Sequence, residues 1–352
     1  MKRLTIFRPP QSLRSGDDIL APLTAALLSQ NGVRTEIHEL WSEWWVRQLW
    51  FSHIPGRRTL FRFGPAHISL QTKKKIVAES NAIWLNGPSK PNDLNCDFEK
   101  WILKAGKFYI FHIQDDWFSI PGLKECASVR VRVASQIIVP TPGLKERILD
   151  LFPSSNVLVL EEPVDINRLY SDKYPLSQKI PVIIWSGSPY NLQEIPGFSE
   201  ILQSVYKEHP FIFRVISGSK RPLFDLDIPW EWHPYDTLKE NSLMSGASIA
   251  LAPLTDSPYS RCKGCYKIKT YLAAGIPVIA SAVGYQKELV QHGKTGFLAN
   301  NANDWKEYFL ELLGNYELSV RMGITARNVA VDKFSHKALI PLWAEALKKI
   351  GG

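Results

Sequence analysis

Apolar residues occur in short runs along the first half of the chain, and polar, turn-forming stretches separate these runs. The runs are rich in aliphatic and aromatic residues, which predicts short, buried strands. The strands expected on this basis are Leu4–Phe7, Arg34–Leu40, Ala82–Leu85, Phe108–Ile113 and Gln136–Pro140. A helical stretch at Asp17–Gln30 separates the first two, and Asp17 or Asp18 is placed to cap it. Strands that alternate with helices predict a parallel sheet covered by helices on both faces.

The pattern restarts in the second half. A strand is expected at Asn156–Leu160, and the polar, proline-containing stretch Glu161–Lys179 suits a linker between domains. Further strands are expected at Ile180–Trp185, Phe211–Ser217, Ala247–Ala252 and Val278–Ala280. A doubly wound sheet binds its ligand at the carboxyl ends of its strands. The predicted fold class is therefore α/β, with two Rossmann-like doubly wound domains that face each other across a cleft.

Length and composition agree with this organisation. The 352 residues suffice for two domains of roughly 150–180 residues each. Hydrophobic residues make up 45% of the chain and charged residues 22%, which is typical of a folded protein and excludes general disorder. No run approaches the ~18 apolar residues of a membrane span, and the N-terminus does not resemble a signal peptide. The four cysteines are too scattered for a disulfide framework, so a reducing cytoplasm is expected.

The formal net charge is +8, which predicts an anionic partner. Nucleoside diphosphates, acidic lipid headgroups and nucleic acids all meet this requirement. The chain has no long lysine or arginine run of the kind that marks a nucleic-acid tail, so a nucleic-acid partner is not expected.

The most informative motif runs from Lys263 to Val278. It predicts a helix that ends at Gly275 and is followed at once by a buried strand. Lys263 and Lys267 are four residues apart, so we expect both on one face near the start of this helix. Two cations beside a helix N-terminus suit a diphosphate. The alternative is an ordinary helix–strand unit with two solvated lysines.

Residues Lys267–Val278 and Ser281–Leu298 resemble the donor-binding region of the GT-B retaining glycosyltransferases, known as group 1 or family 4. The resemblance continues to Phe334-Ser335 and covers about 90 residues closely. It implies an acceptor-binding domain over residues 1–162, a linker over 163–179 and a nucleotide-sugar-binding domain over 180–330. Residues 331–352 would form a C-terminal helix that can pack back on the first domain.

The sequence departs from the family at the donor site. Two glutamates usual in the family are replaced by Cys262 and Thr270, and the loop at Ser186–Asn191 lacks the usual arginine and lysine. A threonine hydroxyl can hydrogen-bond a ribose but cannot replace a bidentate carboxylate. Lys263 and Lys267 are therefore assigned to the phosphates. The donor-binding residues implied are Gly187, Ser188, Lys263, Lys267, Thr270, Gly284 and Tyr285.

Catalytic candidates follow two strands of the first domain. Asn86 occupies the place of a family histidine, and His112, Asp115 and Asp116 lie on the next strand and its turn. Carboxylates there can orient an acceptor hydroxyl or accept its proton. Capping of a turn by the two aspartates, and a core position for His112, are the alternatives.

Two other patterns carry weaker indications. Cys262 and Cys265 form one CxxC pair without a second pair or a nearby histidine, which favours coincidence over a metal site. The segment Trp41–Phe63 interleaves aromatics with arginines and suits a membrane surface, an acceptor site or a packed helix. Its residues Trp44, Trp45 and Arg47, together with Gly16, are the acceptor or membrane candidates.

The expected activity is transfer of a hexose from a nucleotide-sugar donor to a glycan or lipid-linked acceptor in the synthesis of a cell-surface polysaccharide or glycolipid. The resemblance implies retention of configuration and no metal or other cofactor. The expected location is the cytoplasm, including the inner face of an anionic membrane. A degenerate GT-B subunit that binds nucleotide or glycan without turnover is the alternative.

Overall fold

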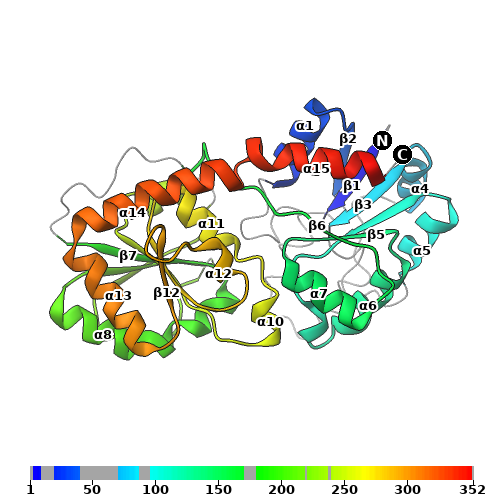
Figure 1. The fold of residues 1–352 in the computed structure, drawn as a ribbon. Helices are drawn as coiled ribbons and strands as arrows, with labels where there is room; N and C mark the ends of the chain where they lie inside the picture. The colour runs from blue at the N-terminus through cyan, green and yellow to red at the C-terminus, as the bar shows by residue number, and fades with distance from the viewer. Residues whose placement is uncertain are drawn as a thin grey trace. The chain divides into compact units, whose positions relative to one another are not determined.

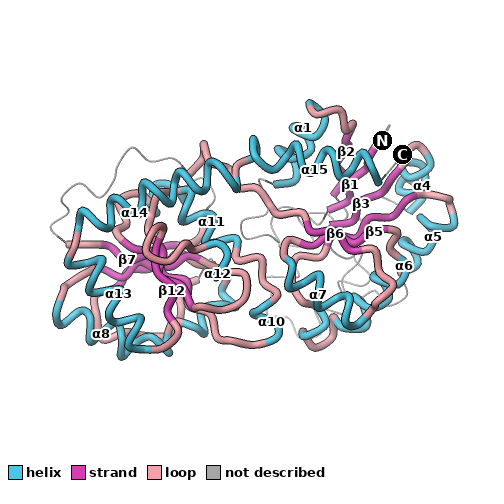
Figure 2. Tube along the Cα trace, in the orientation of Figure 1, coloured by secondary structure: helices cyan, strands magenta, loops and turns pink. Residues whose placement is uncertain are grey.

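A computed structural model describes residues 3–8, 20–39, 70–86, 96–169, 180–218, 220–236 and 239–350. The chain divides into two compact units. The first comprises residues 1–162, 262–264 and 339–352, and the second comprises residues 163–261 and 265–338. Each unit contains one parallel sheet between layers of helices (Figures 1 and 2).

The first sheet has the strand order β2-β1-β3-β4-β5-β6, and every pairing is parallel. Its strands are β1 (Leu4–Arg8), β2 (Thr35–Glu39), β3 (Ala82–Asn86), β4 (Phe108–His112), β5 (Gln136–Val139) and β6 (Val157–Val159). The helices that the structure describes before residue 163 are α1 (Leu20–Gln30), α4 (Leu70–Ala78), α5 (Asp97–Lys104), α6 (Lys124–Val133) and α7 (Pro142–Leu151), with the short η3 (Trp117–Ser119).

Alternate residues of these strands enter two different cores, as the two-residue period of a strand requires. Phe111 and the strand residues that face the same side of the sheet pack with Phe98, Val131 and Ile148 of α5, α6 and α7. Ile110 and the strand residues that face the opposite side pack with Leu28 of α1. That second core also contains side chains from the end of the chain: Leu339, Ile340, Trp343, Ala344 and Leu347 of α15 (His336–Ile350). Figure 1 shows α15 beside α1.

The second sheet has the order β12-β11-β10-β7-β8-β9, again parallel throughout. Its strands are β7 (Val182–Ser186), β8 (Ile212–Ile216), β9 (Trp230–His233), β10 (Ile249–Ala252), β11 (Val278–Ser281) and β12 (Gly296–Ala299). The helices are α8 (Ser199–Glu208), α9 (Glu240–Met244), α10 (Pro258–Arg261), α11 (Tyr266–Ala273), α12 (Gln286–Leu289), α13 (Ala302–Gly314) and α14 (Tyr316–Val329), with the short η4 (Pro189–Glu194), η5 (Pro196–Phe198) and η6 (Ala330–Phe334).

In the second unit too, alternate residues of the strands enter two different cores, one on each face of the sheet. Ile184, Ala250 and Val278 pack with α11 on one face. Ile183, Leu251 and Ile279 pack with α8 and α13 on the other face. The predicted α/β fold class with doubly wound, parallel sheets is confirmed. All predicted strands are present, with ends that differ by one or two residues.

Candidate functional site

The strand order of the second sheet reverses at β7, because β8 follows on one side and β10 lies on the other. A crevice for a ligand forms at the carboxyl ends of the strands at such a point. The segment that leaves β7 is Ser186-Gly187-Ser188, and α11 packs beside β10 and β11. The predicted donor residues Gly187, Ser188 and Lys267 therefore belong to one end of one sheet.

Lys267 reaches the carboxyl edge of β7 from the first turn of α11. Its ammonium lies 4.5 Å from the centre of the Trp185 ring, a distance at which a cation is attracted by the face of an indole. A Cβ atom added to Gly187 would lie 2.9 Å from the Trp185 ring and 3.4 Å from Lys267 Nζ. Gly187 thus lets the Trp185 ring and the Lys267 ammonium approach the backbone closely, which a side chain at this position would prevent.

Gly187 and Ser188, in the loop after β7, make hydrogen bonds within the protein that the sequence did not predict. The N–H of Gly187 donates to the carbonyl of Ile216, 3.1 Å away, so it extends the ladder between β7 and β8. It is therefore not a free donor for a phosphate. The hydroxyl of Ser188 accepts a hydrogen bond from the N–H of Tyr190 and caps η4. Among the predicted donor residues, Lys267 is the one that places a positive charge at this end of the sheet.

Thr270 is buried, with 3% of its surface exposed, and its hydroxyl donates to the carbonyl of Tyr266 at 3.2 Å. The threonine in place of a family glutamate is thus held within its own helix. A bond to a ribose would require this hydroxyl to exchange its partner. The ribose contact stays a prediction.

Lys263 does not share a helix face with Lys267, because α11 begins at Tyr266 rather than near Lys263. Cys265 precedes the helix with a φ of 49°, and this left-handed residue ends the loop. Residues 262–264 belong to the first unit, where Lys263 lies within electrostatic reach of Asp115. The expected pair of cations on one helix is therefore wrong, and a role for Lys263 at the diphosphate stays a prediction.

Gly284 and Tyr285 lie between β11 and α12 in the second unit. Gly284 has a φ of 50°, and a Cβ there would lie 2.7 Å from the Cα of Arg261. This close approach brings the loop after β11 against the end of α10. Tyr285 is half-buried and packs on the same core as α11.

The two aspartates after β4 have different surroundings. Asp116 is buried, and its carboxylate accepts hydrogen bonds from the N–H of Phe118 (3.1 Å) and the hydroxyl of Ser119 (2.5 Å). Arg147 Nε lies 3.4 Å from the same carboxylate. This is the capping alternative raised from the sequence. Asp115 is half-buried, and burial raises its pKa while Lys263 opposes the rise. Asp115 is the better placed of the two to exchange a proton.

His112 has the features of a core histidine. It is 3% exposed and makes edge contacts with the rings of Trp84 and Trp343, whose centres lie 5.5 and 6.0 Å away. Its Nε2 lies 3.8 Å from Glu162 Oε1, which also accepts a hydrogen bond from Gln114. At this exposure His112 presents almost no surface that an acceptor could touch. Asn86 ends β3 beside His112 in the sheet register, and its side chain lies outside the described residues.

Gly16, Trp44, Trp45, Arg47 and the whole segment Trp41–Phe63 also lie outside the described residues, as does the cap expected at Asp17 or Asp18. None of the helices that the structure describes is long and apolar enough to cross a bilayer.

Cys262 and Cys265 do not form a disulfide. Cys262 belongs to the first unit, and burial raises the pKa of its thiol to about 11. Cys265 belongs to the second unit. Within the described ranges, no cluster of three His, Cys, Asp or Glu side chains is arranged to hold a metal ion.

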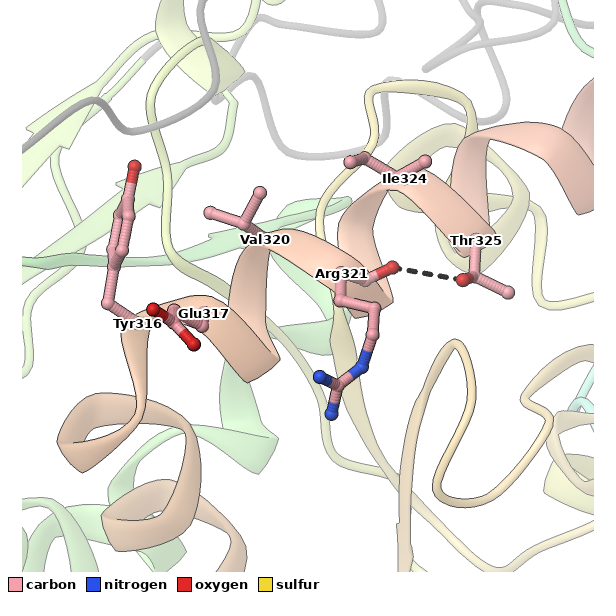
Figure 3. A pocket seen from close by; sticks show the side chains of 6 residues that line it. All are labelled: Tyr316, Glu317, Val320, Arg321, Ile324 and Thr325. Atoms are coloured by element: carbon pink, nitrogen blue, oxygen red, sulfur yellow. Dashed lines mark hydrogen bonds between the residues drawn. The ribbon is translucent and has the colours of Figure 1, made fainter.

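A hollow of about 310 Å³ lies on α14. Figure 3 shows its lining: Tyr316, Glu317, Val320, Arg321, Ile324 and Thr325, all on the same helix. One helix supplies every wall, and no predicted site residue takes part. We therefore place the candidate site at β7 and α11 rather than at this hollow.

Two residues of the site were not identified from the sequence, namely Trp185 and Tyr271. The hydroxyl of Tyr271 accepts a hydrogen bond from the N–H of Ser186 at 2.6 Å and donates to its carbonyl at 3.2 Å. The available signal was spacing: Tyr271 follows Lys267 by one helical turn, so both side chains share the helix face beside β7.

Comparison with known proteins places these features in context. Residues 181–315 match the model of the family described as glycosyl transferases group 1. A mannosyltransferase of Dictyostelium discoideum, GDP-Man:Man(3)GlcNAc(2)-PP-Dol alpha-1,2-mannosyltransferase, is 33% identical over 95 residues. That match covers 27% of this chain and 18% of the mannosyltransferase, so the chain is similar to a minor part of that relative.

Solved structures share the architecture at low sequence identity. Sucrose-phosphate synthase from Thermosynechococcus elongatus superposes with a TM-score of 0.68 and 16% identity, covering 99% of this chain and 98% of that one. HepE from Anabaena, in complex with UDP and glucose, superposes with a TM-score of 0.67 and 15% identity, covering 99% and 100%. These similarities extend over both units and concern the fold.

Proposed function

We propose that the chain transfers a sugar from a nucleotide-sugar donor held by the second unit, because residues 181–315 match the model of glycosyl transferases group 1. The two Rossmann-like units constitute a GT-B fold. The observation that carries the proposal is the Lys267 ammonium at the carboxyl end of β7, where the strand order reverses. A cation there stabilises the charge that develops on a departing nucleoside diphosphate.

The proposed acceptor is a glycan or a lipid-linked saccharide. The relative from Dictyostelium discoideum is named for a dolichol-linked substrate, which supports the lipid-linked class. HepE was solved with UDP and glucose, which supports a nucleotide-sugar donor whose leaving group is a nucleoside diphosphate. Docking on an anionic membrane through Trp41–Phe63 belongs to the same proposal and is checked by co-sedimentation with anionic vesicles.

Retention of configuration and independence from metal are further parts of the proposal. Neither Cys262 nor Thr270 supplies a carboxylate for a covalent adduct, which favours attack of the acceptor on the face that the diphosphate leaves. In this reaction the donor phosphate helps accept the acceptor's proton. Nuclear magnetic resonance of the first product gives its anomeric configuration, and inversion would contradict retention. The rate should be unchanged by a chelator.

The function is tested by measuring release of UDP or GDP from a panel of nucleotide sugars, with a cell lysate separated into lipid and water-soluble acceptor fractions. We expect release with at least one donor, and loss of about tenfold or more in donor affinity on Lys267→Ala, since a charge-assisted contact contributes about 1.5–3 kcal/mol. Lys333→Ala is the control, because Lys333 is an exposed lysine of the same unit. Nucleotide binding without release in any fraction would favour the degenerate subunit instead.

A further inference from the structure

At its carboxyl end, β7 pairs with β8 over more residues than it pairs with β10. Pairing with β8 continues to Ser186, which lies opposite Ile216, whereas pairing with β10 stops at Ile184. The N–H of Gly187 points to the β8 side and donates to Ile216. The N–H of Ser186, one residue earlier, therefore points to the β10 side, where the ladder has ended.

Tyr271 supplies the partner that β10 does not. Its hydroxyl accepts from the N–H of Ser186 and donates to the carbonyl of the same residue. The side chain of Tyr271 is fully buried, so water does not replace these bonds when they are lost. The hydroxyl thus joins α11 to the last residue of β7.

The same helix face carries Lys267, one turn before Tyr271. The Lys267 side chain extends across the end of β7 and places its ammonium 4.5 Å from the ring centre of Trp185. Trp185 is fully buried, so the ring is a fixed surface. The hydroxyl of Ser217 donates to the carbonyl of Gly187 at 2.7 Å and holds the other side of the loop.

We propose that Tyr271, together with Trp185, is a positioning residue for the donor diphosphate. Tyr271 fixes α11 against Ser186, and Trp185 provides the surface over which the Lys267 ammonium is held, so that the cation stands beside Gly187 before the donor binds. This inference rests on the proposed function, because it takes the diphosphate as the group that Lys267 meets. A preplaced cation binds without the cost of ordering a long, flexible side chain on binding.

The hydroxyl of Tyr271 keeps its proton in this arrangement. Burial raises the pKa of Tyr271 far above its usual range, although the bond from Ser186 opposes the rise. The hydroxyl is therefore neutral at physiological pH. Tyr271→Phe removes two hydrogen bonds and no charge, so any loss of affinity for a diphosphate must arise through position.

The test measures dissociation constants of UDP and GDP, and of uridine and guanosine, by calorimetry. Tyr271→Phe is expected to weaken diphosphate binding about tenfold and to leave nucleoside binding unchanged, because only the diphosphate contacts the displaced cation. Tyr266→Phe is the matched control. Its hydroxyl donates to the carbonyl of Pro163, 3.4 Å away, on the same helix but not at β7. It should leave both constants unchanged.

A double-mutant cycle separates positioning from general loss of structure. In a Lys267→Ala background, Tyr271→Phe should have no further effect on diphosphate binding, since the two changes act on one contact. Trp185→Phe provides the same readout if Tyr271→Phe does not fold. Equal losses for nucleosides and diphosphates, or additive losses in the cycle, would overturn the inference. Wild-type protein that binds no nucleoside diphosphate would overturn the proposed function as well.

Discussion

At the scale of single residues, the adjacent carboxylates Asp115 and Asp116 have different environments. Asp116 is occupied by two hydrogen bonds and lies close to Arg147. Burial raises the pKa of Asp115, and Asp116 adds to the rise while Lys263 opposes it. A carboxyl group with a raised pKa near a strand end suits proton transfer, which is the role predicted for it.

The raised pKa of Asp115 has a consequence for stability. The folded state then binds the proton more tightly than the unfolded state does, so the contribution of Asp115 is fully present in acid and is lost as pH rises through the folded pKa. Asp115→Asn should therefore raise the melting temperature at pH 7. The gain should disappear as pH falls below the ordinary value of 3.8. Calorimetry across pH 3–8 measures this difference.

Asp304 serves as the control, because its pKa is shifted in the opposite direction. A hydrogen bond from the backbone of Asn300 lowers the pKa of Asp304, so ionisation is favoured in the folded state. Asp304→Asn should lower the melting temperature at pH 7 and have no effect in acid. A melting temperature for Asp115→Asn that equals the wild type at every pH would show that the Asp115 carboxylate is solvated.

Part of the site followed from the sequence, and the rest depended on contacts that no local pattern encodes. Lys267 and Gly187 meet at one end of β7, as the resemblance implied. The helix start at Tyr266, which separates Lys263 from Lys267, depends on a left-handed Cys265, and spacing alone gave no sign of it. The burial of Thr270 is also set by packing, since threonine is equally suited to an exposed position.

At the scale of elements, prediction succeeded where strands are apolar and buried on both faces. β7 and β10 are buried at every position. β9 was missed because its sequence Trp-Glu-Trp-His is half-buried at each position and lies at the sheet edge. β12 was missed because it begins with a glycine and also lies at the sheet edge. Edge strands contact one neighbour, so their sequences are less constrained.

The contact between α14 and α11 depends on Gly323. A Cβ added there would lie 2.3 Å from the carbonyl oxygen of Gly275, at the end of α11. Backbone atoms cannot give way as a flexible side chain does, so Gly323→Ala should lower the free energy of unfolding by about 1–3 kcal/mol. Urea denaturation measures this change.

Gly314, the last residue of α13, is the matched helical glycine. A Cβ at Gly314 would meet only the ring of His209, at 3.8 Å. Gly314→Ala should therefore be neutral or stabilising by up to about 1 kcal/mol, as alanine favours a helix. A similar loss for both variants would mean that the contact with Gly275 does not determine the effect.

At the scale of the whole molecule, the first unit is assembled from distant parts of the chain. Trp343 stacks on Trp84 with ring centres 5.3 Å apart, and its indole N–H donates to the carbonyl of Glu161 at 2.8 Å. Trp343 is 3% exposed in this core. The final helix thus completes a core that begins with β1.

Trp343→Ala should lower the free energy of unfolding by about 3–5 kcal/mol, as for other buried large aromatics. Leu342, its neighbour on α15, is 56% exposed and provides the control. Leu342→Ala should change stability by no more than about 0.5 kcal/mol. Urea denaturation of both variants makes the comparison, and equal stabilities would contradict a core role for Trp343.

The position of α15 also bears on how the protein emerges from a ribosome. The core containing Leu4 and Ile110 remains incomplete until Leu347 has been synthesised. At about 5–20 residues per second, synthesis of residues 163–352 occupies roughly 10 to 40 seconds. All of the second unit is made in that interval, so this later part of the chain can reach its native state first. The nascent N-terminal sheet would meanwhile expose the apolar face that α15 covers, which makes it a natural client for chaperones that bind unfinished chains.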